Sequence, residues 1–212
     1  MQRSLVGSEM CIRDRYSLVG SNGCGKSTIF KLLERFYECK VGKIEINQVP
    51  INKYSASDLR NNIVYMPKKP FFLQGTIMDN LKLGQNEISD LEVIEVCKKV
   101  GIHSDIQKLE KGYYELIESG GENFSSGQKQ KLGFVRVLLK KADIVLLDEV
   151  TSDLDGEAER QICNQIEEIA KKAIVLNIAH KPESIRRSKK VFFIQGGKIV
   201  AEGTHKALMK NC

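Results

Sequence analysis

Short apolar runs alternate with amphipathic segments over most of the chain. The run at 16–19 comes before a segment that starts near Lys26 and carries apolar residues at helical spacing, which predicts a strand followed by a helix. Later, the uninterrupted apolar run at 144–147 predicts a parallel strand buried on both faces, with a helix at 157–171 and a strand at 173–179 after it. This order of elements predicts an α/β fold with a parallel-sheet core. The apolar face expected for the first helix consists of Ile29, Phe30, Leu32, Leu33, Phe36 and Tyr37.

The middle of the chain is predicted to be mainly helical and to form an inserted lobe. Thr76 can cap a helix, residues 91–100 are amphipathic, and another helix is expected to begin near Ser125. Outside this lobe, short strands are predicted at 43–47, 49–51, 63–66, 191–194 and 198–201, the last two joined by a hairpin turn. The expected divisions are a leader at 1–15, a core lobe at 16–67 and 141–212, and a helical lobe with its entry loop at 68–140.

Composition narrows the classes of function. The chain has 212 residues, a formal net charge of +6 and no uncharged apolar window long enough to span a bilayer. Its lysines are scattered in short pairs and do not alternate with aromatic residues, so no nucleic-acid partner is expected. The six cysteines include no C-x-x-C pair, which predicts reduced thiols rather than disulfides or a metal cluster.

The strongest chemical signal is the segment 20–28, which matches G-x-x-x-x-G-K-[ST] between the first predicted strand and helix. Glycines in such a loop let backbone N–H groups turn toward phosphates, and the helix N-terminus adds partial positive charge. We expect Lys26 to reach the β- and γ-phosphates and Ser27 to offer its hydroxyl to Mg2+. The segment therefore predicts a nucleoside triphosphate site made of Gly20, Ser21, Asn22, Gly23, Cys24, Gly25, Lys26, Ser27 and Thr28.

Two carboxylates follow the buried strand at 144–147. Asp148 ends this strand and Glu149 comes next, at the edge where open α/β sheets bind ligands. Taken alone, such a pair is equally well explained as solvated groups at a strand end. Combined with the phosphate loop, the pair predicts Asp148 as a Mg2+ ligand and Glu149 as the general base that activates water.

These motifs, in this order, make the chain resemble the ATP-binding cassette (ABC) family, specifically the nucleotide-binding domain of an exporter-like ABC transporter. Residues 20–28 match the Walker A motif, and residues 144–148 match Walker B with Glu149 at the catalytic glutamate. Residues 124–128 are similar to the signature motif LSGGQ, and His180 falls at the switch histidine. The resemblance implies a P-loop NTPase fold with a RecA-like parallel sheet flanked by helices, an inserted helical subdomain and a reduced N-terminal β-subdomain. Further matching stretches are Ser152–Asp155, Gly75–Ile77 with Asn80, and Glu202–His205.

The resemblance also implies an activity and partners. It implies an ATPase that uses ATP and Mg2+ to power transport across a membrane, with export expected, and it implies His180 as a γ-phosphate sensor. The implied partners are a second nucleotide-binding domain, identical or different, and a transmembrane domain, on the same polypeptide or another. The implied location is the cytoplasmic face of the cell membrane, whereas the transported substrate is not readable. The residues implied to reach the other domain's nucleotide are Ser125, Ser126, Gly127 and Gln128.

The signature segment and the histidine also have purely structural explanations. Ser125-x-x-Gln128 ahead of an apolar-periodic helix is a capping box. That interpretation is compatible with phosphate binding, because a helix N-terminus with a free serine hydroxyl suits an anion. His180 on its own would more simply be a structural histidine, but Glu149 and the phosphate loop favour the sensor role.

Three positions depart from the family pattern. Lys68 stands where the family has the Q-loop glutamine, and a lysine can neither accept a hydrogen bond from water nor ligate a metal. We therefore predict slow hydrolysis with ATP binding retained. Ser126 replaces the first signature glycine, and Asp153 replaces a small D-loop residue. A weakly hydrolysing regulatory domain thus remains an alternative, as does a soluble ABC ATPase acting on ribosomes or DNA, which the exporter-type motifs disfavour.

The N-terminal segment does not fit the family. Residues 1–15 contain no aromatic that could stack on adenine, and Tyr16 lies too close to the phosphate loop to do so. Residues 4–15 resemble translated sequencing-adapter text more than an ABC strand. We therefore expect the leader to be foreign or disordered, and an upstream region to be missing.

Overall fold

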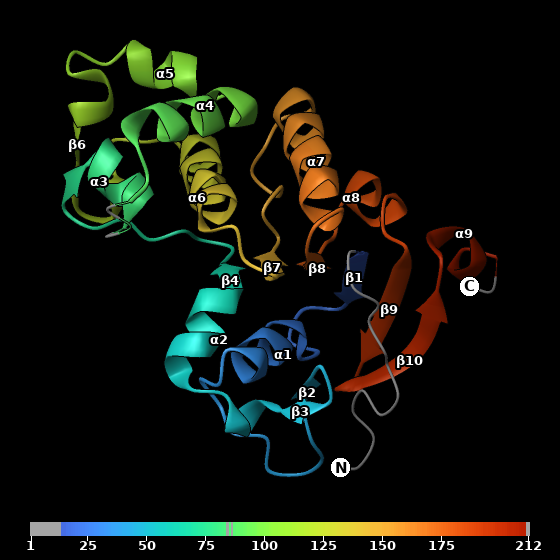
Figure 1. Cartoon of the computed structure of the whole chain (residues 1–212). Helices are drawn as coiled ribbons and strands as arrows, with labels where there is room; N and C mark the ends of the chain where they lie inside the picture. Colours follow the sequence, from blue (N-terminus) through green and yellow to red (C-terminus); the bar gives the residue numbers. More distant parts are fainter. Residues whose placement is uncertain (1–13, 84, 86, 211–212) are drawn as a thin grey trace. The chain divides into compact units, whose positions relative to one another are not determined.

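A computed structural model describes residues 14–83, 85 and 87–210 of the chain. These residues form two compact units (Figure 1). The described part of the first unit comprises residues 14–65, 142–149 and 170–210, and the second comprises residues within 66–141 and 150–169.

The first unit is built on a six-stranded sheet with the order β10-β9-β1-β8-β7-β4. Strand β1 is parallel to both β8 and β9, β7 is parallel to β8, and β10 is antiparallel to β9. The predicted α/β fold with a parallel-sheet core is confirmed. The strands in sequence order are β1 (Arg15–Gly20), β4 (Ile63–Met66), β7 (Ile144–Asp148), β8 (Ile174–Ile178), β9 (Lys190–Gln195) and β10 (Lys198–Gly203).

The register of the sheet brings the ends of three parallel strands to one edge. Leu18 in β1 and Asp148 in β7 are both paired with Ile178 in β8. Because the three strands run in the same direction, the residues that follow them leave the sheet from its carboxyl edge. This edge carries Gly20, Glu149 and the chain toward His180.

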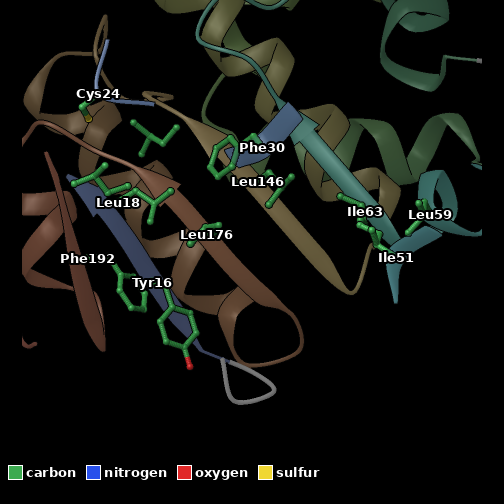
Figure 2. Close-up of a cluster of buried hydrophobic side chains, with 12 residues drawn as sticks. Tyr16, Leu18, Cys24, Phe30, Ile51, Leu59, Ile63, Leu146, Leu176 and Phe192 are labelled. Carbon is green, nitrogen blue, oxygen red and sulfur yellow. The ribbon is translucent and has the colours of Figure 1, made fainter. Parts of the chain in front are cut away.

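Apolar side chains from both the sheet and its neighbouring helices fill the core of the first unit, as Figure 2 shows. Phe30 of helix α1 (Lys26–Leu33) is fully buried, and Leu59 of helix α2 (Ala56–Asn62) belongs to the same cluster. The run in β7 is buried on both faces, as predicted, since Val145, Leu146 and Leu147 are all at most 1% exposed. The other members of the cluster are Tyr16, Leu18, Cys24, Ile51, Ile63, Leu146, Leu176, Ile178, Phe192 and Ile194.

Helix α1 ends earlier than its hydrophobic pattern predicts. Arg35 adopts a left-handed conformation with φ 57°, which stops the helix after Leu33. Phe36 and Tyr37 then lie beyond the helix and are 67% and 53% exposed, so the prediction that both belong to its apolar face is wrong.

Two hairpins and several short helices complete the first unit. The β2–β3 hairpin turns at Asn47 and Gln48, both with positive φ, and its strands are shorter than predicted. The predicted turn between β9 and β10 is confirmed, with Gly196 and Gly197 at positive φ. The remaining elements are β2 (Glu45–Ile46), β3 (Val49–Pro50), the 3-10 helix η1 (Ile51–Lys53), α8 (Pro182–Arg186) and α9 (His205–Leu208).

The second unit is mainly helical. Helices α3 (Ile77–Lys82) and α4 (Asp90–Val100) both pack against α6 (Ser126–Lys140). Thr76 caps α3 through a complete capping box, which confirms its predicted role. The other elements are β5 (Gly75–Thr76), α5 (His103–Gln107), η2 (Gly112–Tyr114), β6 (Leu116–Ile117), η3 (Ser119–Gly121) and α7 (Gly156–Ala170).

The two units do not follow the predicted divisions everywhere. Residues 66, 67 and 141, which were predicted in the core lobe, belong to the helical unit. Residues 150–169 group with the helical unit rather than with the sheet. Arg15 is the first residue of β1, is 3% exposed and donates from its guanidinium to Ser184, so the sheet begins one residue before the predicted boundary. Asp14 of the predicted leader is also described: its carbonyl oxygen accepts from the Val175 N–H, and its carboxylate pairs with Lys189. The remaining leader residues, 1–13, lie outside the described residues. Among the helices that the structure describes, none is long and apolar enough to cross a membrane.

Candidate active site

The phosphate loop joins β1 to α1 in the first unit, and its glycines are required by the backbone. Gly20 has φ 153°, and a Cβ atom there would lie 2.1 Å from the carbonyl oxygen of Ile194. Gly25 caps α1 with φ 104°, a conformation that L side chains rarely adopt. These two positions let the chain turn tightly from the strand into the helix, whose first N–H groups have no intrahelical acceptor.

Lys26 points into this loop rather than into solvent. Its side chain is buried, and its Nζ donates to the carbonyl oxygens of Gly20 and Ser21, each at 2.9 Å. The Sγ atom of Cys24 lies 3.9 Å from the same nitrogen. An ammonium group has three N–H donors, and two of those of Lys26 bind these carbonyls. Phosphate oxygens that enter the loop would compete with the carbonyls for the ammonium group.

Ser27 and Asp148 meet at the sheet edge although they are far apart in the sequence. The Ser27 hydroxyl donates to Asp148 Oδ2 at 2.7 Å, and Asp148 is 6% exposed. A hydroxyl and a carboxylate are the hard oxygen ligands that Mg2+ takes, together with phosphate oxygens and water. The predicted metal ligands therefore fit this ion.

Tyr65, which is not among the predicted site residues, also faces Asp148. Its hydroxyl donates to Asp148 Oδ2 at 3.4 Å, and its ring packs edge-on against Phe30 with centroids 5.8 Å apart. Burial, and secondly the charge of Asp148, raise the pKa of Tyr65 above its ordinary value, so the hydroxyl stays a donor. Nearby Glu34 has its pKa raised to about 7 by burial. The available signal for this role was the position of Tyr65, which lies one residue before the end of β4, the strand next to β7.

Glu149 and His180 form a second pair at the same edge. Glu149 follows β7 with φ 51°, and its N–H donates to the carbonyl oxygen of Ile178 at the end of β8. Its Oε1 lies 2.9 Å from His180 Nε2, and the two side chains are 15% and 43% exposed, Glu149 being the more buried. The left-handed turn at Glu149 thus directs the carboxylate toward the histidine that follows the neighbouring strand.

The signature segment lies in the second unit, at the N-terminus of α6. Ser125 and Gln128 form a complete capping box: the Ser125 hydroxyl accepts from the Gln128 N–H at 3.2 Å, and Gln128 Oε1 accepts from the Ser125 N–H at 3.0 Å. The predicted capping box is confirmed, so the serine hydroxyl already accepts one bond. Ser125 and Ser126 are exposed, and a Cβ on Gly127 would lie 3.5 Å from the carbonyl oxygen of Asp153.

The predicted residues thus fall into two groups. The first unit brings the phosphate loop, Asp148, Glu149 and His180 to one sheet edge. The second unit carries the signature segment and Lys68, whose backbone carbonyl accepts a hydrogen bond from Gln130 Nε2.

The sequence of the chain is similar to those of known proteins. A family model described as ABC transporter matches residues 11–152. The ABC multidrug transporter MDR2 of Trichophyton rubrum is 39% identical over 199 residues, which is 92% of this chain and 15% of that protein. The leptomycin B resistance protein pmd1 of Schizosaccharomyces pombe is 38% identical over 195 residues and is matched over 14% of its length. The chain therefore spans about 15% of the length of these curated relatives.

A solved structure extends the match to the fold. The structure of a bacterial Atm1-family ABC exporter with ATP bound superposes with a TM-score of 0.90 at 31% identity, covering 93% of this chain and 35% of that one. The predicted P-loop NTPase fold is confirmed by this match. Because the family model covers more than half of the chain, the chain belongs to the ABC transporter family.

Proposed function

We propose that this chain is the ATP-binding and ATP-hydrolysing domain of an ABC exporter, and that it acts by ATP-driven head-to-tail dimerisation. The observation that carries the proposal is the meeting of Lys26, the Ser27–Asp148 pair and the Glu149–His180 pair at one edge of a single sheet. This set contains each group that phosphoryl transfer to water requires: a phosphate cradle, metal ligands and a base.

The residues have distinct roles in this proposal. The N–H groups of the loop and the Lys26 ammonium bind the phosphates, while Ser27 and Asp148 hold Mg2+. When bound, Mg2+ neutralises charge that develops on the phosphate oxygens. The Glu149 carboxylate accepts a proton from the attacking water, and His180 orients that carboxylate through its Nε2 contact.

The signature segment gives the reason for a dimer. Ser125 and Ser126 are exposed at the start of a 15-residue helix, where free N–H groups and the helix dipole favour an anion. We propose that this turn contacts the γ-phosphate bound by a second domain, identical or different. A transmembrane domain would then convert closing and reopening of the pair into export, at the cytoplasmic face of the membrane.

Replacing Glu149 with Gln tests the proposal. The amide keeps the shape of the side chain and can still bond His180, but it cannot take the proton from water. We expect Glu149→Gln to bind ATP normally, to release phosphate at least about 100-fold more slowly, and to form an ATP-dependent dimer in gel filtration. Glu202→Gln, which removes a carboxylate paired with Lys190, is the matched control and should behave as the parent. Unchanged phosphate release in Glu149→Gln would contradict the proposal.

A second candidate function is a regulatory domain that binds ATP but turns it over slowly. The observation that favours it is Lys68, a cation where the family has an amide. Parallel assays of ATP binding and phosphate release on the parent chain distinguish the two functions, because only the regulatory domain would bind without appreciable release.

A further inference from the structure

One face of α6 runs along the segment 66–73, within the second unit. Three positions spaced by three residues form this face: Gln130, Gly133 and Arg136. On a helix, positions three residues apart lie above one another, so the three form one stripe. Each of the three lies against this segment: Gln130 at Lys68, Gly133 at Pro70 and Met66, and Arg136 at Phe71.

Gln130 holds the segment at its first contact point. The side chain is 2% exposed, and its Nε2 donates to the carbonyl oxygen of Lys68. Loss of this hydrogen bond would remove the donor that Gln130 offers to the carbonyl of Lys68. Leaving a buried polar group without its hydrogen-bond partner costs free energy of folding. The bond involves the backbone of residue 68, so the contact does not depend on which side chain stands there.

Gly133 lets the segment approach the helix closely. A Cβ atom at this position would lie 2.7 Å from Pro70 Cγ, 2.9 Å from Pro70 Cβ and 3.1 Å from Met66 Cε. The proline ring cannot swing aside as a long side chain can. Any larger residue at 133 would therefore push the segment away from α6.

Arg136 fixes the far end of the segment. Its Nη1 donates to the carbonyl oxygen of Phe71 at 2.6 Å, and its guanidinium lies 4.5 Å from the ring centroid of Phe72. The same guanidinium donates to the backbone and side-chain oxygens of Asn80 in α3. Burial lowers the pKa of Arg136 to about 10, so the group remains charged at neutral pH.

We propose that Gln130, Gly133 and Arg136 are positioning residues that join the segment 66–73 to the signature turn as one rigid piece. The turn at Ser125 is fixed to the first residues of α6 by its capping box, and the stripe begins only two residues after Gln128. If the segment 66–73 moves, α6 therefore moves with it and displaces the turn at Ser125. This inference rests on the proposed function, because it assigns the turn its task at a second domain's phosphate.

The test separates this stripe from the general stability of α6. Gln130→Met keeps the size and the apolar stem but removes the donor to Lys68. Lys131→Met is the matched control: Lys131 Nζ donates to the carbonyl oxygen of Gly101 at 3.1 Å, so this change also removes one bond from α6 to a backbone carbonyl. Both changes are made in the Glu149→Gln background, and ATP-dependent dimerisation is measured by gel filtration while ATP binding is measured on dilute monomer.

We expect Gln130→Met to raise the ATP concentration for half-maximal dimerisation about tenfold, with monomer binding within about twofold of the parent. Lys131→Met should change neither quantity. Equal effects in the two variants, or no effect in Gln130→Met, would overturn the inference while leaving the proposed function intact. Absence of a dimer in the Glu149→Gln parent would overturn both.

Gly133→Ala provides a second variant should Gln130→Met fail to fold. Alanine is a better helix former than glycine, so the change favours α6 itself. We nevertheless expect it to weaken ATP-dependent dimerisation severalfold, because the new methyl displaces Pro70. Dimerisation equal to or stronger than that of the parent would refute the stripe, since helix propensity alone would then account for the result.

Discussion

In the first unit, the residues that meet at the sheet edge lie as far apart in the sequence as Lys26 and His180, whereas in the second unit four consecutive residues make the turn at Ser125–Gln128. The first arrangement depends on strand pairing, which sets Asp148 beside Ile178 and so places the side chains that follow. The second depends on two local hydrogen bonds and the start of a helix.

Burial differs between the two regions as well. Lys26 and Asp148 are each 6% exposed, while Ser125 and Ser126 are open to solvent. Enclosed charged groups have their full electrostatic effect on a bound phosphate, because little water screens them. An exposed turn instead suits a surface that engages another molecule. The proposed function uses this difference: in it, the sheet edge carries out the chemistry and the turn completes the site of a second domain.

Replacing Lys26 with Ala is expected to have the greatest effect, because it removes the charge on which the sheet edge depends. We expect the affinity for ATP to fall at least about 100-fold, since charge-assisted bonds to phosphate are lost. Equilibrium binding of labelled ATP measures the effect. Lys31→Ala, on the same helix with its ammonium 5.5 Å from the Tyr37 ring, is the control and should bind as the parent does. Equal binding by Lys26→Ala and the parent would contradict the assignment of the nucleotide to the first unit.

Within the first unit, the hydrophobic pattern predicts some elements correctly and others not. The uninterrupted apolar run at 144–147 correctly predicts a strand buried on both faces. Since successive side chains point to opposite faces of a strand, a run without polar residues is stable only where protein covers both faces. Periodicity fails at Phe36 and Tyr37, because the apolar spacing continues past the point where Arg35 turns left-handed. A helix end set by one backbone conformation leaves no trace in the hydrophobic pattern.

Local motifs are visible in the sequence, whereas their tertiary supports are not. The capping box at Ser125 follows from four consecutive letters. The roles of Tyr65, Gln130 and Arg136 depend on which carboxylate or carbonyl lies opposite each, and only the folded chain shows that. Gln130 stands between Lys129 and Lys131 in the sequence, so its burial, and with it the need for a partner, is seen only in the folded chain.

Lys68 lies in the second unit and yet is predicted to slow hydrolysis. We expect Lys68→Gln to raise the rate of phosphate release about tenfold, corresponding to roughly 1.4 kcal/mol in the barrier. Its affinity for ATP should stay unchanged, and the contact with Gln130 should survive because it uses the backbone carbonyl. Lys69→Gln, the same substitution one residue along, is the control. A rate no higher than that of the parent would show that the lysine does not limit hydrolysis.

The smallest expected effect concerns Tyr65, and it tests whether the sheet edge extends beyond the motifs. Tyr65→Phe keeps the packing against Phe30 but removes the donor to Asp148 Oδ2. Since the bond is long at 3.4 Å, we expect the apparent affinity for Mg2+ in ATP binding to fall only about threefold, by loss of an outer partner that orients the ligand. Binding of labelled ATP across a Mg2+ titration measures this shift, and binding without Mg2+ should not change. Tyr54→Phe removes a hydroxyl that donates to the carbonyl oxygen of Ile46 at 2.8 Å in the same unit, and it should leave the Mg2+ dependence as it is in the parent. Identical titrations for all three proteins would mean that Ser27 alone orients Asp148.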